Sequence, residues 1–189
     1  DMDFAAKIGV SRTPVREAVI QLSEESRIIE IFPQRGMRIA PIDVELVEEA
    51  RSLRVLLEKQ IAGMCCEMAT EEDIKWLQEN VGLQEFYMEN SRPEMVMQLD
   101  DEMHHKLFMI CHRELTYGMC QKLAIHYDRI RSLSVNTVKD NTIIEDHRKI
   151  IQFIAEHKKE NAMAQMEKHL SRWQLNEGKF RQEFPDYFK

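Results

Sequence analysis

Three histidines and one aspartate are the residues of this chain best suited to hold a metal ion. Asp101 and His105 are four residues apart in a stretch with helical apolar period, so they share one face of the predicted helix. His147 and His169 lie in two later predicted helices, each beside apolar residues that mark an inward face. Imidazole nitrogens with one carboxylate suit Zn²⁺, Ni²⁺ or Mn²⁺, and affinity order alone does not choose among them.

A structural explanation is open for each of these residues. An Asp-x-x-x-His spacing often arises as a surface carboxylate–histidine pair, and inward histidines can be satisfied in a core. An unpaired inward histidine carries a desolvation cost, which coordination to a metal would offset. The residues alone leave both interpretations open. The remaining histidines are interpreted as structural or solvent-exposed: His104, His112, His126 and His157.

A second group of residues has the chemistry of DNA contact. Arginine meets the O6 and N7 acceptors of guanine, hydroxyls and helix-start N–H groups suit phosphates, and glycine at a wing tip permits close backbone approach. The candidates are Ser11, Arg12, Thr13, Arg16, Arg35 and Gly36. Any one arginine could instead be ordinary solvated surface, so the interpretation depends on the elements that carry the group.

Residues 1–41 are predicted to form a winged helix-turn-helix. A short first helix ends at Gly9, and Thr13 followed by Pro14 has the pattern of an N-cap and first helical residue. β-Branched residues on both sides of the turn at Gln34–Gly36 predict a β-hairpin. This organisation places the DNA-contact candidates at the start of the second helix and at the wing tip.

Residues 42–189 show no strand pattern and are predicted to form an all-α bundle of about six helices. The second of these helices opens at Thr70 with a capping box. The predicted helices cover residues 43–68, 70–89, 93–112, 115–134, 142–157 and 159–183. The fold class is therefore mainly α, with an N-terminal winged helix and a helical domain that would bring the metal-ligand candidates together.

Composition excludes several classes of protein. The chain has 189 residues, with 43% hydrophobic and 31% charged residues, which is ordinary for a globular protein and excludes whole-chain disorder. Six glycines and five prolines are too few for the many turns of a sandwich or barrel. With no apolar run of 18 residues and no signal-peptide pattern, we expect a cytoplasmic protein. Its four cysteines are expected to be reduced thiols: Cys65, Cys66, Cys111 and Cys120.

The net charge of −7 argues at first against nucleic-acid binding, but it is unevenly distributed. Residues 1–41 hold six basic and six acidic residues, whereas residues 42–189 hold 20 basic and 27 acidic residues. The acidic surplus thus belongs to the helical domain. The neutral N-terminal domain keeps its arginines at the predicted reading positions.

The N-terminal motif resembles a known family. Residues 10–18 (Val-Ser-Arg-Thr-Pro-Val-Arg-Glu-Ala) resemble the signature of GntR-family transcriptional regulators, and Pro33–Gly36 resembles that family's wing. The resemblance implies operator contacts by Arg12, Thr13, Arg16 and Gly36. The glycine usual before the first wing strand is replaced around Ser26 and Arg27, and the family's first helix is absent, so we expect an N-terminally truncated domain.

The helical part is similar to the FCD ligand-binding domain of the FadR subfamily. The matching stretches are Arg54–Glu58, Asp101 with His105, His147-Arg148, and Met166–Leu170. The resemblance implies a divalent metal held by Asp101, His105, His147 and His169. It also implies that Arg54 faces the effector cavity, although an ion pair with Glu58 is an equal alternative, and Arg148 is a weaker candidate. His104 in place of an aromatic residue, and His112-Arg113-Glu114 in place of Gly-Asn, depart from the pattern.

Together these features predict a bacterial-type regulator, not an enzyme. A homodimer would bind near-palindromic operator DNA, and a small organic acid beside the metal would change its affinity. Two alternatives remain: a metal-dependent helical enzyme acting on a small organic acid, and a dimerisation module that has lost effector binding.

Overall fold

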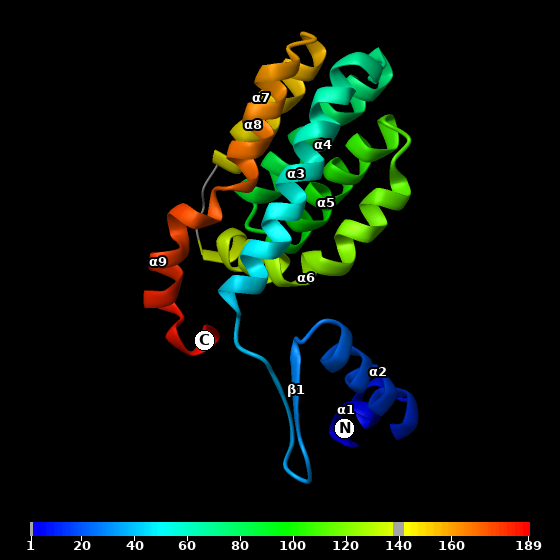
Figure 1. Cartoon of the computed structure of the whole chain (residues 1–189), viewed down its shortest axis with the longest axis vertical. Helices are drawn as coiled ribbons and strands as arrows, with labels where there is room; N and C mark the ends of the chain where they lie inside the picture. The colour runs from blue at the N-terminus through cyan, green and yellow to red at the C-terminus, as the bar shows by residue number, and fades with distance from the viewer. Residues whose placement is uncertain (1, 138–141) are drawn as a thin grey trace.

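The computed structural model describes residues 2–137 and 142–189 and shows two parts joined by an extended linker (Figure 1). The smaller part is a winged helix, in which a hairpin stands beside two helices. Its elements are α1 (Met2–Ile8), α2 (Arg12–Glu25), β1 (Ile29–Phe32) and β2 (Gly36–Ile39). The two strands are antiparallel, with Ile29 opposite Ile39 and Phe32 opposite Gly36. The predicted mainly α fold with an N-terminal winged helix is confirmed.

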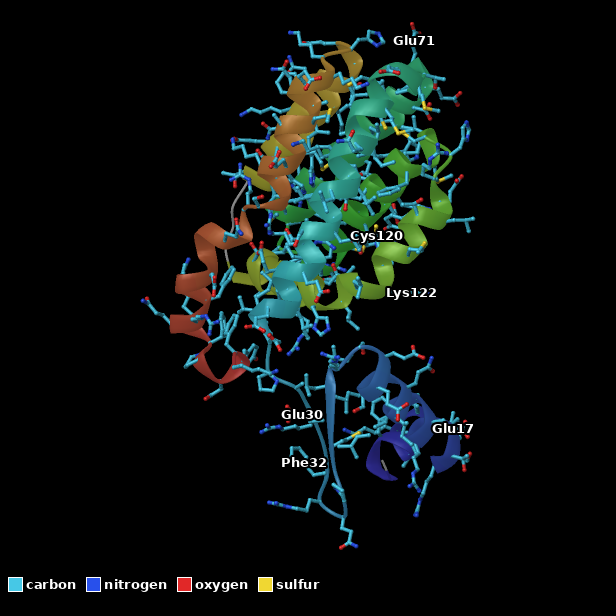
Figure 2. The ribbon with its side chains drawn as sticks, in the orientation of Figure 1. Glu17, Glu30, Phe32, Glu71, Cys120 and Lys122 are labelled. Atoms are coloured by element: carbon cyan, nitrogen blue, oxygen red, sulfur yellow. The ribbon has the colours of Figure 1, made fainter. Side chains whose placement is uncertain are left out.

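The winged helix has a small core and a tight wing turn. Ala5, Val15 and Val19 are buried together, with Ile29 of β1 packed against them. Figure 2 shows Glu30 and Phe32 on the side of the hairpin that faces away from α2, as strand alternation requires. Gly36 has φ +105°, which a residue with a Cβ rarely adopts, so glycine suits this end of the turn.

The prediction that Thr13 is the N-cap of α2 is wrong. The helix begins at Arg12, and Ser11 is the N-cap residue, with extended backbone angles and no side-chain capping hydrogen bond. Thr13 and Pro14 therefore lie inside the first turn. Proline is tolerated there because the first-turn N–H groups have no partner within the helix.

The larger part is an all-α bundle. Its helices are α3 (Val44–Met68), α4 (Glu71–Glu89), α5 (Pro93–Ile110), α6 (Glu114–Thr137), α7 (Thr142–Ala155), α8 (Lys159–Leu170) and α9 (Trp173–Glu183), followed by the short 3₁₀ turn η1 (Pro185–Tyr187). Helix α3 is central and contacts α5, α6, α7 and α8. The main core includes the fully buried side chains of Met103, Leu107, Phe108, Ile150 and Met166.

The last predicted helix, residues 159–183, is in fact two helices. The backbone leaves the α-helical pattern at Ser171 and Arg172, whose N–H groups bond to the carbonyls of Lys168 and His169, three residues back. The Arg172 side chain pairs with buried Asp146 of α7. This break allows α9 to turn away from α8 and contact α6 (Figure 1).

The linker between the two parts is held at defined points. Arg129 of α6 donates to the carbonyl oxygen of Ala40 at 2.7 Å and to that of Pro41 at 3.5 Å. The backbone of Ile42 bonds to the C-terminal tail through Tyr187 and Lys189. The linker that carries the winged helix is therefore fixed to α6 and to the C-terminal tail.

Candidate metal centre and nucleic-acid interface

One buried cluster in the helical domain has the composition of a metal site. It consists of Asp100 and His104 from α5, His147 from α7 and His169 from α8. All four side chains are buried, and one potential ligand atom from each lies within 4.8 Å of the others. Two ligand atoms of one tetrahedral zinc ion are about 3.3 Å apart, so small side-chain movements would bring all four to a single ion.

The structure places the predicted ligands Asp101 and His105 outside this cluster, each one residue after a member of it. Asp101 bonds to Arg131 at 2.7 Å outside the cluster. His105 stacks on Tyr117, with ring centroids 4.5 Å apart. One residue corresponds to 100° of helix rotation, which moves these side chains off the inward face. His147 and His169 lie where they were predicted, and His104, interpreted from sequence as structural or exposed, lies in the cluster.

Neighbouring residues fix the orientation of two histidine rings. His104 Nδ1 lies against the Glu58 carboxylate of α3, and His147 Nδ1 lies 2.8 Å from Gln84 Oε1 of α4. Because both partners are oxygen acceptors, we assign the proton to Nδ1 in each ring. Each Nε2 then carries a lone pair. Such an outer hydrogen bond is the usual means by which proteins orient metal-binding histidines.

The cluster contains buried polar atoms whose hydrogen-bonding capacity is unused. His104 Nε2 and His169 Nδ1 are buried without a hydrogen-bond partner among the described residues. His147 Nε2 lies 3.2 Å from Asp100 Oδ1 and 3.3 Å from His169 Nε2. Burying unsatisfied nitrogen costs free energy, and a cation shared by the cluster would offset this cost. The donor set therefore fits a divalent metal.

The protonation states also suit metal binding. Burial opposes ionisation of Asp100, but the charge of Arg131 together with His147 and His104 outweighs it and holds the pKa of this carboxyl well below its usual range. Burial lowers the pKa of His147 despite the nearby Asp100 carboxylate. Burial, followed by His147 and His104, holds the pKa of His169 well below its usual value. The Asp100 carboxylate and the neutral rings of His147 and His169 are forms that coordinate a cation.

A pocket opens beside the cluster. Asp100 and His169 form part of its wall, and it encloses about 550 Å³ including the solvent at its mouth. Its lining is mainly apolar, with three arginines, Arg54, Arg131 and Arg172, among the polar groups. Pockets that bind small molecules have this mixture of apolar walls and a few polar anchors.

The arginines of the pocket already have acidic partners. Arg54 Nε bonds to Glu58 Oε1 at 2.5 Å, so the ion pair considered as an alternative from sequence is present, and Arg54 also lines the pocket. Burial opposes ionisation of Glu58, yet Arg54 and His104 lower its pKa to about 2. The other predicted effector residue, Arg148, is exposed, pairs with Glu85 and borders a different groove between α4 and α7, so it does not contribute to this pocket.

The candidate DNA-contact residues lie together at one end of the winged helix. Ser11, Arg12, Thr13 and Arg16 are exposed on the N-cap and first turns of α2, and Arg35 and Gly36 are exposed at the wing turn. Within the described residues, Arg12, Arg16 and Arg35 form no ion pair. Arg38 differs, because it pairs with Glu30 at 2.7 Å across the hairpin. The three arginines remain available for contact with phosphates or bases.

Sequence reasoning missed several residues of the helical site. The sequence indicates Glu58 only as a partner of Arg54, and no pattern in it marks Gln84, Arg131 or Arg172. Each of these residues contacts a side chain on a different helix. The spacing of residues along a single helix cannot indicate such a contact.

Known proteins resemble this chain both in the helical domain and over its whole length. Residues 49–172 match the FCD domain family. The chain is 28% identical to the HTH-type transcriptional repressor RspR of Escherichia coli over its whole length, covering 82% of that protein. It is 25% identical over 173 residues to the Nta operon transcriptional regulator of Aminobacter aminovorans, a match that covers 91% of this chain and 80% of the relative.

Solved structures show the same fold. A GntR protein of Streptococcus agalactiae superposes with a TM-score of 0.53 at 25% identity, covering 89% of this chain and 84% of that one. McbR/YncC of E. coli superposes with a TM-score of 0.77 at 17% identity, covering 97% and 86%. No described helix is both long and apolar enough to cross a membrane. The winged helix, the FCD match and the named relatives together show that the chain belongs to the FCD domain family and is a GntR-family transcriptional regulator, not an enzyme.

Proposed function

We propose that this regulator binds a divalent metal through Asp100, His104, His147 and His169, and that a small carboxylate in the adjoining pocket changes its affinity for operator DNA. The observation that carries the proposal is the cluster itself. Four buried side chains bring potential ligand atoms within 4.8 Å of one another, two of their ring nitrogens have no hydrogen-bond partner among the described residues, and the adjoining pocket contains arginines. Three nitrogens and one carboxylate suit Zn²⁺, Ni²⁺ or Mn²⁺.

The bound ion would supply a Lewis-acidic position for a carboxylate oxygen. The remaining recognition comes from residues of this chain. Arg54, Arg131 and Arg172 provide guanidinium groups, which bind carboxylates in a bidentate manner. Because each already has an acidic partner, an anionic effector would share or replace an existing ion pair. Effector binding would therefore rearrange contacts between helices rather than fill a passive cavity.

Helix α6 connects the pocket to the DNA-reading domain. Arg131 pairs with Asp100 on one side of α6, and Arg129 holds the linker carbonyls of Ala40 and Pro41 on another. A change at Asp100 that moves Arg131 would also move Arg129, because the two are on the same rigid helix. We propose this as the route by which the pocket biases the position of the winged helix.

A second copy of the chain is the proposed partner of the exposed face of α6. Leu115, Met119 and Leu123 are four residues apart on this face, with 89%, 70% and 45% of their surfaces exposed. Figure 2 shows Lys122 on the outside of this helix, whereas Cys120 is buried beneath it. An apolar stripe of this kind is suited to an interface, and a two-fold dimer would present two winged helices to two half-sites.

We assign residues 1–41 to DNA reading and residues 42–189 to metal binding, effector binding and dimerisation. Arg12, Arg16 and Arg35 would contact bases or phosphates, and the N-cap region of α2 would receive a phosphate. The acidic surplus of the helical domain would keep this domain away from the duplex.

Fluorescence anisotropy with promoter fragments and scrambled DNA tests this function. The intact protein is expected to prefer one promoter fragment at moderate salt, with an affinity that falls as salt rises. Arg16→Ala is expected to reduce this affinity at least tenfold, and Met119→Glu is expected to reduce it by preventing dimer formation, seen as a monomer in sedimentation. Equal binding of the intact protein to promoter and scrambled DNA at every salt concentration would refute the proposal.

A further inference from the structure

Two buried thiols meet between α3 and α5, outside the metal cluster. Cys65 Sγ lies 3.5 Å from Cys111 Sγ, and both side chains are almost fully buried. Each thiol also reaches the other helix: Cys65 Sγ lies 3.4 Å from the Leu107 carbonyl oxygen, and Cys111 Sγ lies 3.6 Å from the Ile61 carbonyl oxygen. The two sulfurs are therefore held against each other by reciprocal contacts between the helices.

The thiol pair has a regular relationship to the metal cluster. Cys65 is seven residues after Glu58 on α3, and Cys111 is seven residues after His104 on α5. Glu58 and His104 are themselves in contact. Helices α3 and α5 therefore run parallel and meet at both contacts, Glu58 with His104 and Cys65 with Cys111. The two contacts are separated along the helices by two turns, or about 10 Å. A change in the spacing of the thiols would act on the helices that carry Glu58 and His104.

The pKa values of the two thiols are shifted in opposite directions. The hydrogen bond with Cys65 lowers the pKa of Cys111, burial opposes this, and Arg113 adds to the lowering. The same hydrogen bond, followed by burial, raises the pKa of Cys65. Cys111 is also the residue at which α5 ends, and exposed His112 follows it with a positive φ of 53°. Opening of this turn would expose Cys111 first.

We propose that Cys65 and Cys111 are an oxidation site that forms a disulfide on reaction with a hydroperoxide. This proposal does not depend on the proposed metal or effector. The Cys111 thiolate attacks one peroxide oxygen, the O–O bond breaks and hydroxide leaves, which converts Cys111 to a sulfenic acid. Cys65 loses its proton to solvent and attacks the Cys111 sulfur, and the sulfenic oxygen leaves as hydroxide and is protonated to water. In total, two thiols and one hydrogen peroxide give one disulfide and two waters.

The other two cysteines supply internal controls. Cys66 Sγ is directed to the Ala62 and Phe153 carbonyl oxygens, at 3.5 and 3.9 Å, and not to another sulfur. Cys120 is buried on α6. Neither has a sulfur neighbour comparable to the Cys65–Cys111 pair among the described residues, so the linkage is expected to be specific.

The test is peptide mass spectrometry of the intact folded protein after treatment with hydrogen peroxide, alkylation and digestion without reductant. A Cys65–Cys111 linked peptide, lighter by two hydrogen atoms and split by dithiothreitol, is expected as the main product. Cys66→Ser and Cys120→Ser are expected to retain the link at wild-type yield. Cys65→Ser and Cys111→Ser are expected to lose it.

Three results would overturn the proposal. One is oxidation of Cys111 to sulfinic acid in the wild-type protein without the linked peptide. Another is loss of the linked peptide in Cys66→Ser, which would show that the bridge uses Cys66. The last is a link that forms only after denaturation, which would show that the folded geometry does not promote it. The wild-type protein gives the main readout, and a variant is compared with it only where circular dichroism shows the wild-type helix content.

Discussion

At the residue scale, the chemistry of the cluster depends on side chains that would not touch the metal. Gln84 accepts the Nδ1 proton of His147, and Glu58 accepts that of His104. Without these acceptors each ring could place its proton on Nε2, the nitrogen that faces the cluster. The acceptors come from α4 and α3, whereas the rings belong to α7 and α5. Ligand orientation is therefore a property of the assembled bundle.

Replacing Gln84 tests this dependence. We expect Gln84→Ala to weaken Zn²⁺ binding by about 10–100-fold, because His147 loses the partner that fixes its tautomer and orientation. Titration against a competing chelator measures this affinity. The control is Gln78→Ala, an exposed glutamine of the same helix, which is expected to bind Zn²⁺ as the wild type does. A Gln84→Ala affinity within twofold of the wild type would contradict the assigned role.

The one-residue offset between the predicted ligands and the cluster residues of α5 has a physical explanation. Asp100-Asp101 and His104-His105 offer two overlapping pairs at a spacing of four residues. The sequence does not distinguish them, because Val96 and Phe108 flank one pair and Met97 and Met109 flank the other. The packed bundle does, since Val96 and Phe108 are buried whereas Met109 is 44% exposed. The inward positions of His147 and His169 were predictable because isoleucines and Leu170 mark those faces.

At the element scale, the start of α4 shows how much a local pattern can predict. The capping box expected at Thr70 is present, with hydrogen bonds in both directions between Thr70 and Asp73. Lys106 of α5 adds an ion pair to Asp73 at 2.6 Å. Burial opposes ionisation of Asp73, but the bonds from Lys106 and Thr70 lower its pKa to about 2. The sequence predicts the cap, but it does not predict the ion pair between Asp73 and Lys106, which lies on another helix.

This cap predicts a pH dependence of stability. The pKa of Asp73 is lower in the folded than in the unfolded state, so its contribution is complete above about pH 4 and is lost as pH falls towards about 2. We expect Asp73→Asn to reduce the free energy of unfolding at pH 7 by about 1–2 kcal/mol and to flatten the decline below pH 4. Urea unfolding at pH 7 and pH 3 measures both effects. The exposed neighbour variant Glu72→Gln serves as the control, and equal losses in the two variants would argue against the cap.

The division between α8 and α9 could not be predicted from local pattern. No glycine or proline marks residues 171 and 172, and the helical period continues across them. The break accompanies the pairing of Arg172 with Asp146, a buried carboxylate of α7 that also accepts from Gln165 at 2.6 Å. Because Asp146 lies on another helix, the helix propensity of residues 159–183 cannot indicate the break.

At the scale of the whole molecule, α6 connects the cluster, the linker and an exposed apolar face. It carries Arg131 at the cluster, Arg129 at the linker and the exposed apolar stripe. The fold class and the two parts were predictable from the helix-turn-helix signature, the wing turn and the helical periods. The role proposed for α6 was not predictable, because it depends on which residues the successive faces of this helix contact after folding.

The proposed coupling through α6 predicts the behaviour of Arg129→Gln. Zn²⁺ affinity is expected to remain within twofold of the wild type, because Arg129 does not contact the cluster. The change in operator affinity between metal-loaded and chelator-treated protein is expected to disappear, because the linker carbonyls lose their contact with α6. Anisotropy titrations with and without Zn²⁺ measure this, and Lys122→Gln is the matched control on the same helix. A coupling of unchanged size in Arg129→Gln would exclude this route.

The central claim is that Asp100 and His104, rather than Asp101 and His105, are the α5 ligands of a bound metal. Metal content is the most direct test of this claim, because it can be measured in variants of either pair. Wild-type protein, His104→Ala and His105→Ala would be loaded with Zn²⁺, dialysed and measured by inductively coupled plasma mass spectrometry. The account predicts about one ion per chain for the wild type and His105→Ala, and near none for His104→Ala. Full metal content in His104→Ala, or its loss in His105→Ala instead, would contradict the account.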